Sequence, residues 1–115
     1  MGNYSGIIIE AEKPYVGVYA ENMNLKALQD AVGGYIEHVS ISKGIGFICN
    51  EDGHNLGLPL NIIATMLYGF SSPVVGNIVI VRTGYVDGEM DFIKFSQEEA
   101  LRICLAIGIS LKFKD

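Results

Sequence analysis

The chain has 115 residues, of which 50% are hydrophobic and 18% are charged; this balance argues against disorder and allows one domain, over residues 1–115, with a buried core. Its net charge of −5 includes only eight scattered Lys and Arg residues, which argues against nucleic-acid binding because phosphate contacts need clustered basic side chains. The N-terminus lacks a signal peptide, and no apolar run reaches the ~20 residues that span a bilayer, so we expect a cytoplasmic protein without membrane contact.

The N-terminal part of the chain predicts two strands and a helix. Residues 6–10 form a β-branched run that is typical of a strand, and residues 15–19 continue an extended pattern after a break at Lys13-Pro14. From Asn24 to Val32 the apolar residues change to helical spacing. Gly33-Gly34 then supplies the left-handed residue that commonly ends a helix.

The middle of the chain predicts a β-hairpin, a short helix and the strongest strand. The hairpin strands are residues 35–42 and 45–50, around the turn Ser42-Lys43-Gly44. Asn61 is a suitable N-cap for a helix over residues 61–67. Residues 74–83 are rich in β-branched side chains, which favours a central strand covered on both faces.

The C-terminal part predicts a strand over residues 90–95, a helix that ends near residue 106 and an edge strand over 109–113. Ser96 and Glu99 have the spacing of a capping box at the start of this helix. Together these elements predict an α+β fold, in which about three short helices pack on an antiparallel or mixed sheet.

Catalytic and metal-binding motifs are absent from the sequence. It contains no phosphate-binding glycine loop, no dinucleotide fingerprint, no nucleophile elbow and no zinc-protease helix. The two cysteines, Cys49 and Cys104, lack metal-ligand spacing and are expected to be reduced, buried thiols. The two histidines, His38 and His54, lie in different segments. We therefore expect no cofactor and no metal site.

The hairpin carries the candidate binding site, and its register depends on the turn. With Lys43-Gly44 as a two-residue turn, Glu37 lies opposite Asn50, and both share a face with Tyr35. A carboxylate, an amide and an aromatic ring on an apolar face suit the recognition of a polar group on a small ligand. A three-residue turn pairs Glu37 with Cys49 instead. The alternative interpretation is that Glu37 and Asn50 lie at the solvated end of the hairpin.

Several short motifs give the sequence a family resemblance. They are Leu28-Gln29, Val32-Gly33-Gly34-Tyr35-Ile36-Glu37, Asn50-Glu51-Asp52-Gly53 and Leu58-Pro59-Leu60-Asn61. In this order they closely resemble the pattern LQ..VGGYIE, NEEGK, GLP.N of a family of small proteins, domain of unknown function 3846, which occurs in phages, plasmids and bacterial genomes. The resemblance covers roughly residues 6 to 100.

The sequence departs from this pattern at His54, where the family often has lysine, and at Ile62, where an arginine commonly follows the asparagine. A basic pair that binds an anion is therefore not carried over to this chain. The resemblance implies a phage or mobile-element context, in which small acidic proteins without catalytic residues often act as inhibitors or sequestering proteins against host defence.

These observations favour a non-enzymatic binding protein that sequesters a small anionic or nucleotide-like signal, or a host protein. The low fraction of charged residues also predicts self-association into a homo-oligomer. The expected ligand-binding residues are those that the motifs place on turns and strand ends: Tyr35, Glu37, Asn50, Glu51 and Asn61.

Two alternatives remain open. One is a small hydrolase in which Glu37 or Glu51 acts as general base, with His38 or His54 as a second catalytic group. The other is an accessory structural protein of a larger assembly, which needs no binding site.

Overall fold

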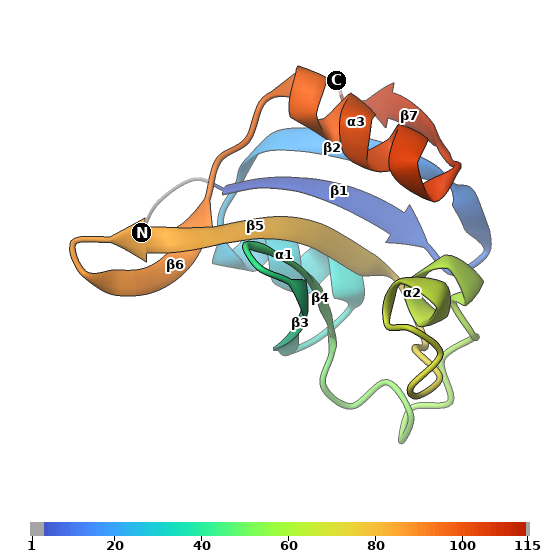
Figure 1. Ribbon diagram of the computed structural model, residues 1–115. Coiled ribbons are helices and arrows are strands. Elements are labelled where there is room, and N and C mark those ends of the chain that lie inside the picture. Colours follow the sequence, from blue (N-terminus) through green and yellow to red (C-terminus); the bar gives the residue numbers. More distant parts are fainter. Residues whose placement is uncertain (1–3, 115) are drawn as a thin grey trace.

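The computed structural model describes residues 4–114, so residues 1–3 and 115 of the expected domain lie outside it. It contains a seven-stranded mixed sheet and three helices, which confirms the predicted α+β fold (Figure 1). The elements in chain order are β1 (Tyr4–Glu10), β2 (Lys13–Met23), α1 (Leu25–Val32), β3 (Ile36–Ser42), β4 (Ile45–Asn50), α2 (Ile62–Leu67), β5 (Ile78–Val86), β6 (Glu89–Ile93), α3 (Gln97–Ile107) and β7 (Ser110–Phe113).

The strands are ordered β3-β4-β5-β1-β2-β7, and β6 pairs with the C-terminal half of β5. The β-branched strand is central, as predicted, but it begins at Ile78 rather than at residue 74. Val75 instead forms an isolated bridge with Leu60. The predicted edge strand is also confirmed: β7 closes one end of the sheet and is parallel to β2, whereas the other pairs are antiparallel.

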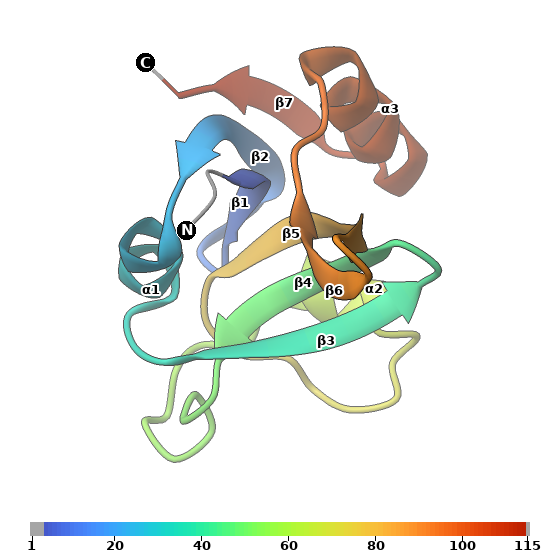
Figure 2. The ribbon, with the colours of Figure 1, turned by 90° about the vertical axis from the view of Figure 1, so that its left-hand side faces the viewer.

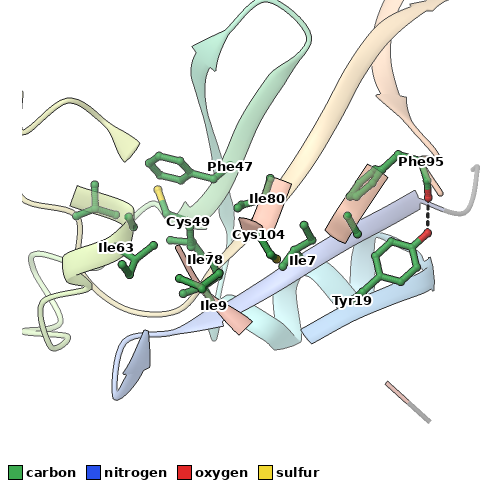
Figure 3. Close-up of a cluster of buried hydrophobic side chains, with 14 residues drawn as sticks. Ile7, Ile9, Tyr19, Phe47, Cys49, Ile63, Ile78, Ile80, Phe95 and Cys104 are labelled. Carbon is green, nitrogen blue, oxygen red and sulfur yellow. Dashed lines mark hydrogen bonds between the residues drawn. The ribbon is translucent and has the colours of Figure 1, made fainter. Parts of the chain in front are cut away.

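The two faces of the sheet bury separate hydrophobic clusters. On one face, α2 and α3 pack over a cluster that includes Ile7, Phe47 and Ile80 (Figure 3). On the other face, α1 packs Leu28 and Val32 over the alternate residues of the strands. Figure 2 shows α1 and α3 on opposite sides of the strands. Residues 78–81 of β5 are all buried. Because successive side chains of a strand point to opposite faces of the sheet, β5 contributes to both clusters.

The helix caps follow the sequence signals, with one exception. The side chain of Asn61 accepts a hydrogen bond from the Ala64 amide, and Gly33 ends α1 with a φ of 81°. Ser96 caps α3 through the Glu99 amide, but the Glu99 carboxylate forms a salt bridge with Arg82 of β5. The capping box is thus only half formed, because Arg82 offers Glu99 a charged partner.

None of the helices within residues 4–114 is long and apolar enough to cross a bilayer.

The β3–β4 hairpin differs from the preferred register. Its turn has two residues, Lys43-Gly44, because Ser42 pairs with Ile45. However, the next pair is Ser40 with Gly46, so Ile41 forms a bulge that shifts the rest of the hairpin by one residue. The pairing of Glu37 with Asn50 was therefore wrong. Glu37 lies opposite Cys49, the alternative register, although a bulge and not a longer turn produces it.

Candidate functional site

A cavity of about 210 Å³ lies where the β3–β4 hairpin meets the turn after β4 and the segment before β5. It brings together four of the polar residues that the sequence singled out: Glu37, Asn50, Glu51 and His54. Buried Phe47 and Cys49 also line it, whereas Glu37, Glu51 and His54 are exposed. We call this cavity the Glu37 pocket. The hairpin and the turn after it supply the pocket's carboxylates together with Phe47 and Cys49, and only the tertiary fold brings residues 72–75 against them.

The bulge at Ile41 decides which side chains face the Glu37 pocket. Because residues directly opposite one another on antiparallel strands point to the same face, Glu37 shares a face with Cys49, and Val39 with Phe47. The Glu37 carboxylate therefore lies near the Cys49 thiol. Burial raises the pKa of this thiol from 9.0 to about 11, and the negative charge of Glu37 adds to the increase.

Asn50 has a supporting role at the base of the pocket. Its Nδ2 donates to the Val32 carbonyl oxygen at 3.2 Å, and its Oδ1 accepts from the Asp52 amide at 2.8 Å. A Cβ atom on Gly34 would lie 2.9 Å from this Nδ2, so the close approach of Asn50 favours glycine there. The amide of Asn50 thus joins two of the sequence motifs, VGGYIE and NEDG.

His54 contributes an imidazole to the rim of the pocket. Its Nε2 lies 3.1 Å from the carbonyl oxygen of Pro73. Since a carbonyl only accepts hydrogen bonds, this contact places a proton on Nε2 and leaves Nδ1 of the neutral ring as an acceptor. No local pattern points to Pro73, because its carbonyl lies 19 residues further along the chain than His54.

Two of the predicted site residues lie elsewhere. Asn61 is 0% exposed, and its Nδ2 donates to the carbonyl oxygens of Ile9 at 3.1 Å and Gly76 at 3.0 Å. Together with the α2 cap, these bonds give Asn61 a structural role rather than contact with a ligand. Tyr35 is 70% exposed and borders a separate hollow beside the end of α1.

His38, a candidate for the hydrolase alternative, is on the opposite face of the sheet from the Glu37 pocket. It pairs with Ile48, and its ring makes an edge contact with Phe92, with ring centroids 5.6 Å apart. The structure therefore separates His38 from His54 and keeps only His54 near the carboxylates.

A larger cavity, of about 490 Å³, was not expected from the sequence. It lies between the β1–β2 turn and the end of α1, and Glu10, Glu12, Lys13 and Asp30 contribute charged groups to its lining. Asn77 holds the walls of this cavity together, because its side-chain oxygen accepts a hydrogen bond from the Ala11 amide at 3.0 Å.

Within residues 4–114, no three His, Cys, Asp or Glu side chains gather closely enough to hold a metal ion.

The cysteine thiols give a pH-dependent prediction. Burial also raises the pKa of Cys104 from 9.0 to about 11. Between these values the unfolded chain releases thiol protons that the folded chain keeps, so the stability should fall as pH rises from about 9 to 11 and should not respond to these groups below pH 9. At pH 8 we expect both thiols to react at least ~100-fold more slowly with a disulfide reagent in native protein than in urea. Equal rates in the two states would contradict this prediction.

The fold and the pocket define the class of protein. It is an α+β domain built on one mixed sheet, with a small carboxylate-lined pocket at the end of a hairpin. The chain belongs to the family described as Domain of unknown function (DUF3846), whose model matches residues 4–104. The family resemblance seen in the sequence is therefore confirmed.

A solved structure with a similar fold is the crystal structure of small RNA methyltransferase HEN1, with a TM-score of 0.59 and 14% sequence identity. The match covers 89% of this chain but only 16% of the methyltransferase chain. At this identity the likeness concerns the fold alone. No curated protein matches the chain.

Proposed function

We propose that the protein is a non-enzymatic binding protein of the phage or mobile-element type, which sequesters a small nucleotide-like signal or a segment of a host protein in the Glu37 pocket. The observation that carries this proposal is the convergence of Glu37, Glu51 and His54 on one cavity with a partly apolar lining. The phage or mobile-element context that the family resemblance implies, together with the acidic balance of the chain, supports an anti-defence role.

The charges of the pocket define the group that it accepts. Ionised Glu37 and Glu51 only accept hydrogen bonds, and no Lys or Arg among residues 4–114 lines the pocket. A phosphate would therefore meet two negative charges without a basic partner. The bound group should instead donate hydrogen bonds, as the amino edge of a nucleobase or a guanidinium group does.

The size of the pocket limits how much of a ligand enters. At about 210 Å³ it is smaller than the ~300–1,000 Å³ typical of sites that enclose a whole drug-sized molecule. A base or a basic side chain fits this description, while the remainder of the ligand stays outside. This arrangement lets a nucleotide place its base in the pocket and keep its phosphate in solvent.

Replacing Glu37 or Glu51 with glutamine should weaken binding at least tenfold, or about 1.4 kcal/mol, because the amide keeps the shape but loses the charge. Native mass spectrometry with a nucleotide panel and with arginine methyl ester identifies a ligand, and calorimetry measures its affinity. Pull-down from host lysate tests whether the ligand is a segment of a host protein. Glu98→Gln, on the exposed surface of α3, is the matched control. Binding that survives both pocket substitutions would place the ligand elsewhere.

The hydrolase alternative has one observation in its favour. The Pro73 contact leaves Nδ1 of His54 free to accept a proton, and Glu37 and Glu51 line the same cavity. If the protein is a hydrolase, wild-type protein should turn over a phosphoester or amide substrate, and Glu37→Gln or Glu51→Gln should abolish that turnover. Turnover unaffected by both substitutions would exclude these carboxylates as general base.

A further inference from the structure

We propose that the partner of the Glu37 pocket is an extended peptide segment, which adds to the sheet as an antiparallel strand beside β3 and places an arginine in the pocket. This inference rests on the proposed function and names the class of its ligand. Within residues 4–114, β3 is the terminal strand of the sheet and pairs only with β4, so its outer edge is open (Figure 2). Glu37 lies on this strand and lines the pocket, so the open edge and the pocket are neighbours.

The hydrogen bonds of the hairpin identify the backbone groups that point outward from β3. The Glu51 amide donates to the Tyr35 carbonyl oxygen at 3.0 Å, which makes these residues a hydrogen-bonded pair of the antiparallel ladder. Such pairs alternate with pairs whose amide and carbonyl groups point away from the neighbouring strand. Two residues further on, Glu37 therefore bonds to β4, while the amide and carbonyl groups of Ile36 and His38 point to the open edge. Groups of this kind are the template on which an additional strand pairs.

The same alternation determines which side chains the added strand presents to the pocket. Glu37 and Val39 both line the pocket, and Val39 also packs against the buried cluster beneath it. On the open edge, the partner residue opposite Glu37 belongs to a non-hydrogen-bonded pair, in which side chains on the same face approach closely. In an antiparallel strand, the residue two positions earlier lies opposite Val39. The segment should therefore contain an apolar residue, then any residue, then an arginine.

Charge complementarity selects the basic side chain opposite Glu37. The carboxylates of Glu37 and Glu51 line the same pocket, and neither forms a salt bridge within the described part of the chain. A strand with an apolar or acidic residue at this position would cover Glu37 without pairing its charge, which discriminates against such strands. A guanidinium group instead donates two parallel hydrogen bonds to a carboxylate, which favours arginine over lysine.

The edge strands of a second copy of the chain do not supply this pattern. Neither β3 nor β6 contains a Lys or Arg residue. The strand β7 contains Lys112, and Lys114 follows it, but the residues two positions before these lysines are Ser110 and Lys112, which are not apolar. The pattern therefore points to a segment of another protein.

Selection of a display library of random peptides on the wild-type protein tests the sequence pattern. Enriched peptides should carry a basic residue, chiefly arginine, with an apolar residue two positions before it. Glu37→Gln should lower their affinity about tenfold or more, because the arginine loses its charged partner. Glu98→Gln, in an exposed ion pair on α3, is the matched control and should leave the affinity unchanged. A library without enrichment, or enrichment of peptides without a basic residue, would overturn the proposal.

Backbone methylation of an enriched peptide tests the strand pairing itself. The residue just before the arginine lies opposite His38 and directs its amide to β3, so N-methylation there should weaken binding about tenfold or more. The amide of the arginine points away from β3, so N-methylation of the arginine should have little effect. Equal effects of the two methyl groups would refute strand addition.

Arginine methyl ester and the nucleotide panel separate this inference from the proposed function. If a small ligand binds and Glu37→Gln removes that binding, but no peptide distinguishes the two methylation positions, strand addition is wrong and the pocket remains a binding site. If neither a peptide nor a small ligand binds in a way that depends on Glu37, both the inference and the proposed function are wrong.

Discussion

Replacing Phe47 with alanine is expected to lower the free energy of unfolding by about 3–5 kcal/mol. The Phe47 side chain is fully buried on β4 between β3 and β5 (Figure 3). Its ring makes an edge contact with Tyr68 at the end of α2. Its removal leaves a cavity that the strands cannot close without breaking their pairing. Urea unfolding followed by circular dichroism measures the effect.

Phe113→Ala serves as the control for this prediction. Phe113 lies on the edge strand β7 and is 52% exposed, so its truncation should cost only about 1 kcal/mol. Similar losses at the two positions would mean that Phe47 is not part of a tightly packed core. Because the residue also lines the Glu37 pocket, Phe47→Ala should change ligand affinity as well as stability.

The second large effect is expected at Asn61, whose replacement by alanine should cost about 3–7 kcal/mol. The substitution removes the cap of α2 and leaves the carbonyl oxygens of Ile9 and Gly76 without this donor in the interior. Losing an N-cap costs about 1 kcal/mol, and each buried group left unsatisfied adds about 1–3 kcal/mol.

Asn24→Ala separates these contributions. Asn24 caps α1 through the Ala27 amide in the same way, but it is exposed and makes no comparable long-range bonds within the described residues. We therefore expect Asn24→Ala to cost only the ~1 kcal/mol of a cap. If the two substitutions had equal effects, the long-range bonds of Asn61 would contribute nothing to stability.

These results would also explain part of the family pattern in physical terms. Asn61 belongs to the motif LPLN, and Asn50 belongs to NEDG. Both asparagines use their amides to hold distant backbone segments together. Glu37 and Glu51, in contrast, are exposed at the pocket, and neither carboxylate has a hydrogen-bond partner within the part of the chain that the structure describes. Within these motifs, the asparagines therefore stabilise the fold, and the two carboxylates are the better candidates for binding.

The sequence by itself determined the features that depend on neighbouring residues. The caps at Asn61 and Ser96 and the helix end at Gly33 follow from hydrogen bonds and backbone preferences within a few residues. The central position of β5 follows from its β-branched composition, because only a strand covered on both faces can bury such a run.

Only the tertiary structure decided the site. The bulge at Ile41 shifts Glu37 by one position, and no local signal distinguishes a bulge from a regular ladder. The same holds for the contacts of Asn61 with Ile9 and of His54 with Pro73, which join residues 52 and 19 positions apart. Hydrogen bonds of this kind form because folding buries their partners together, and the local sequence does not encode which partners meet.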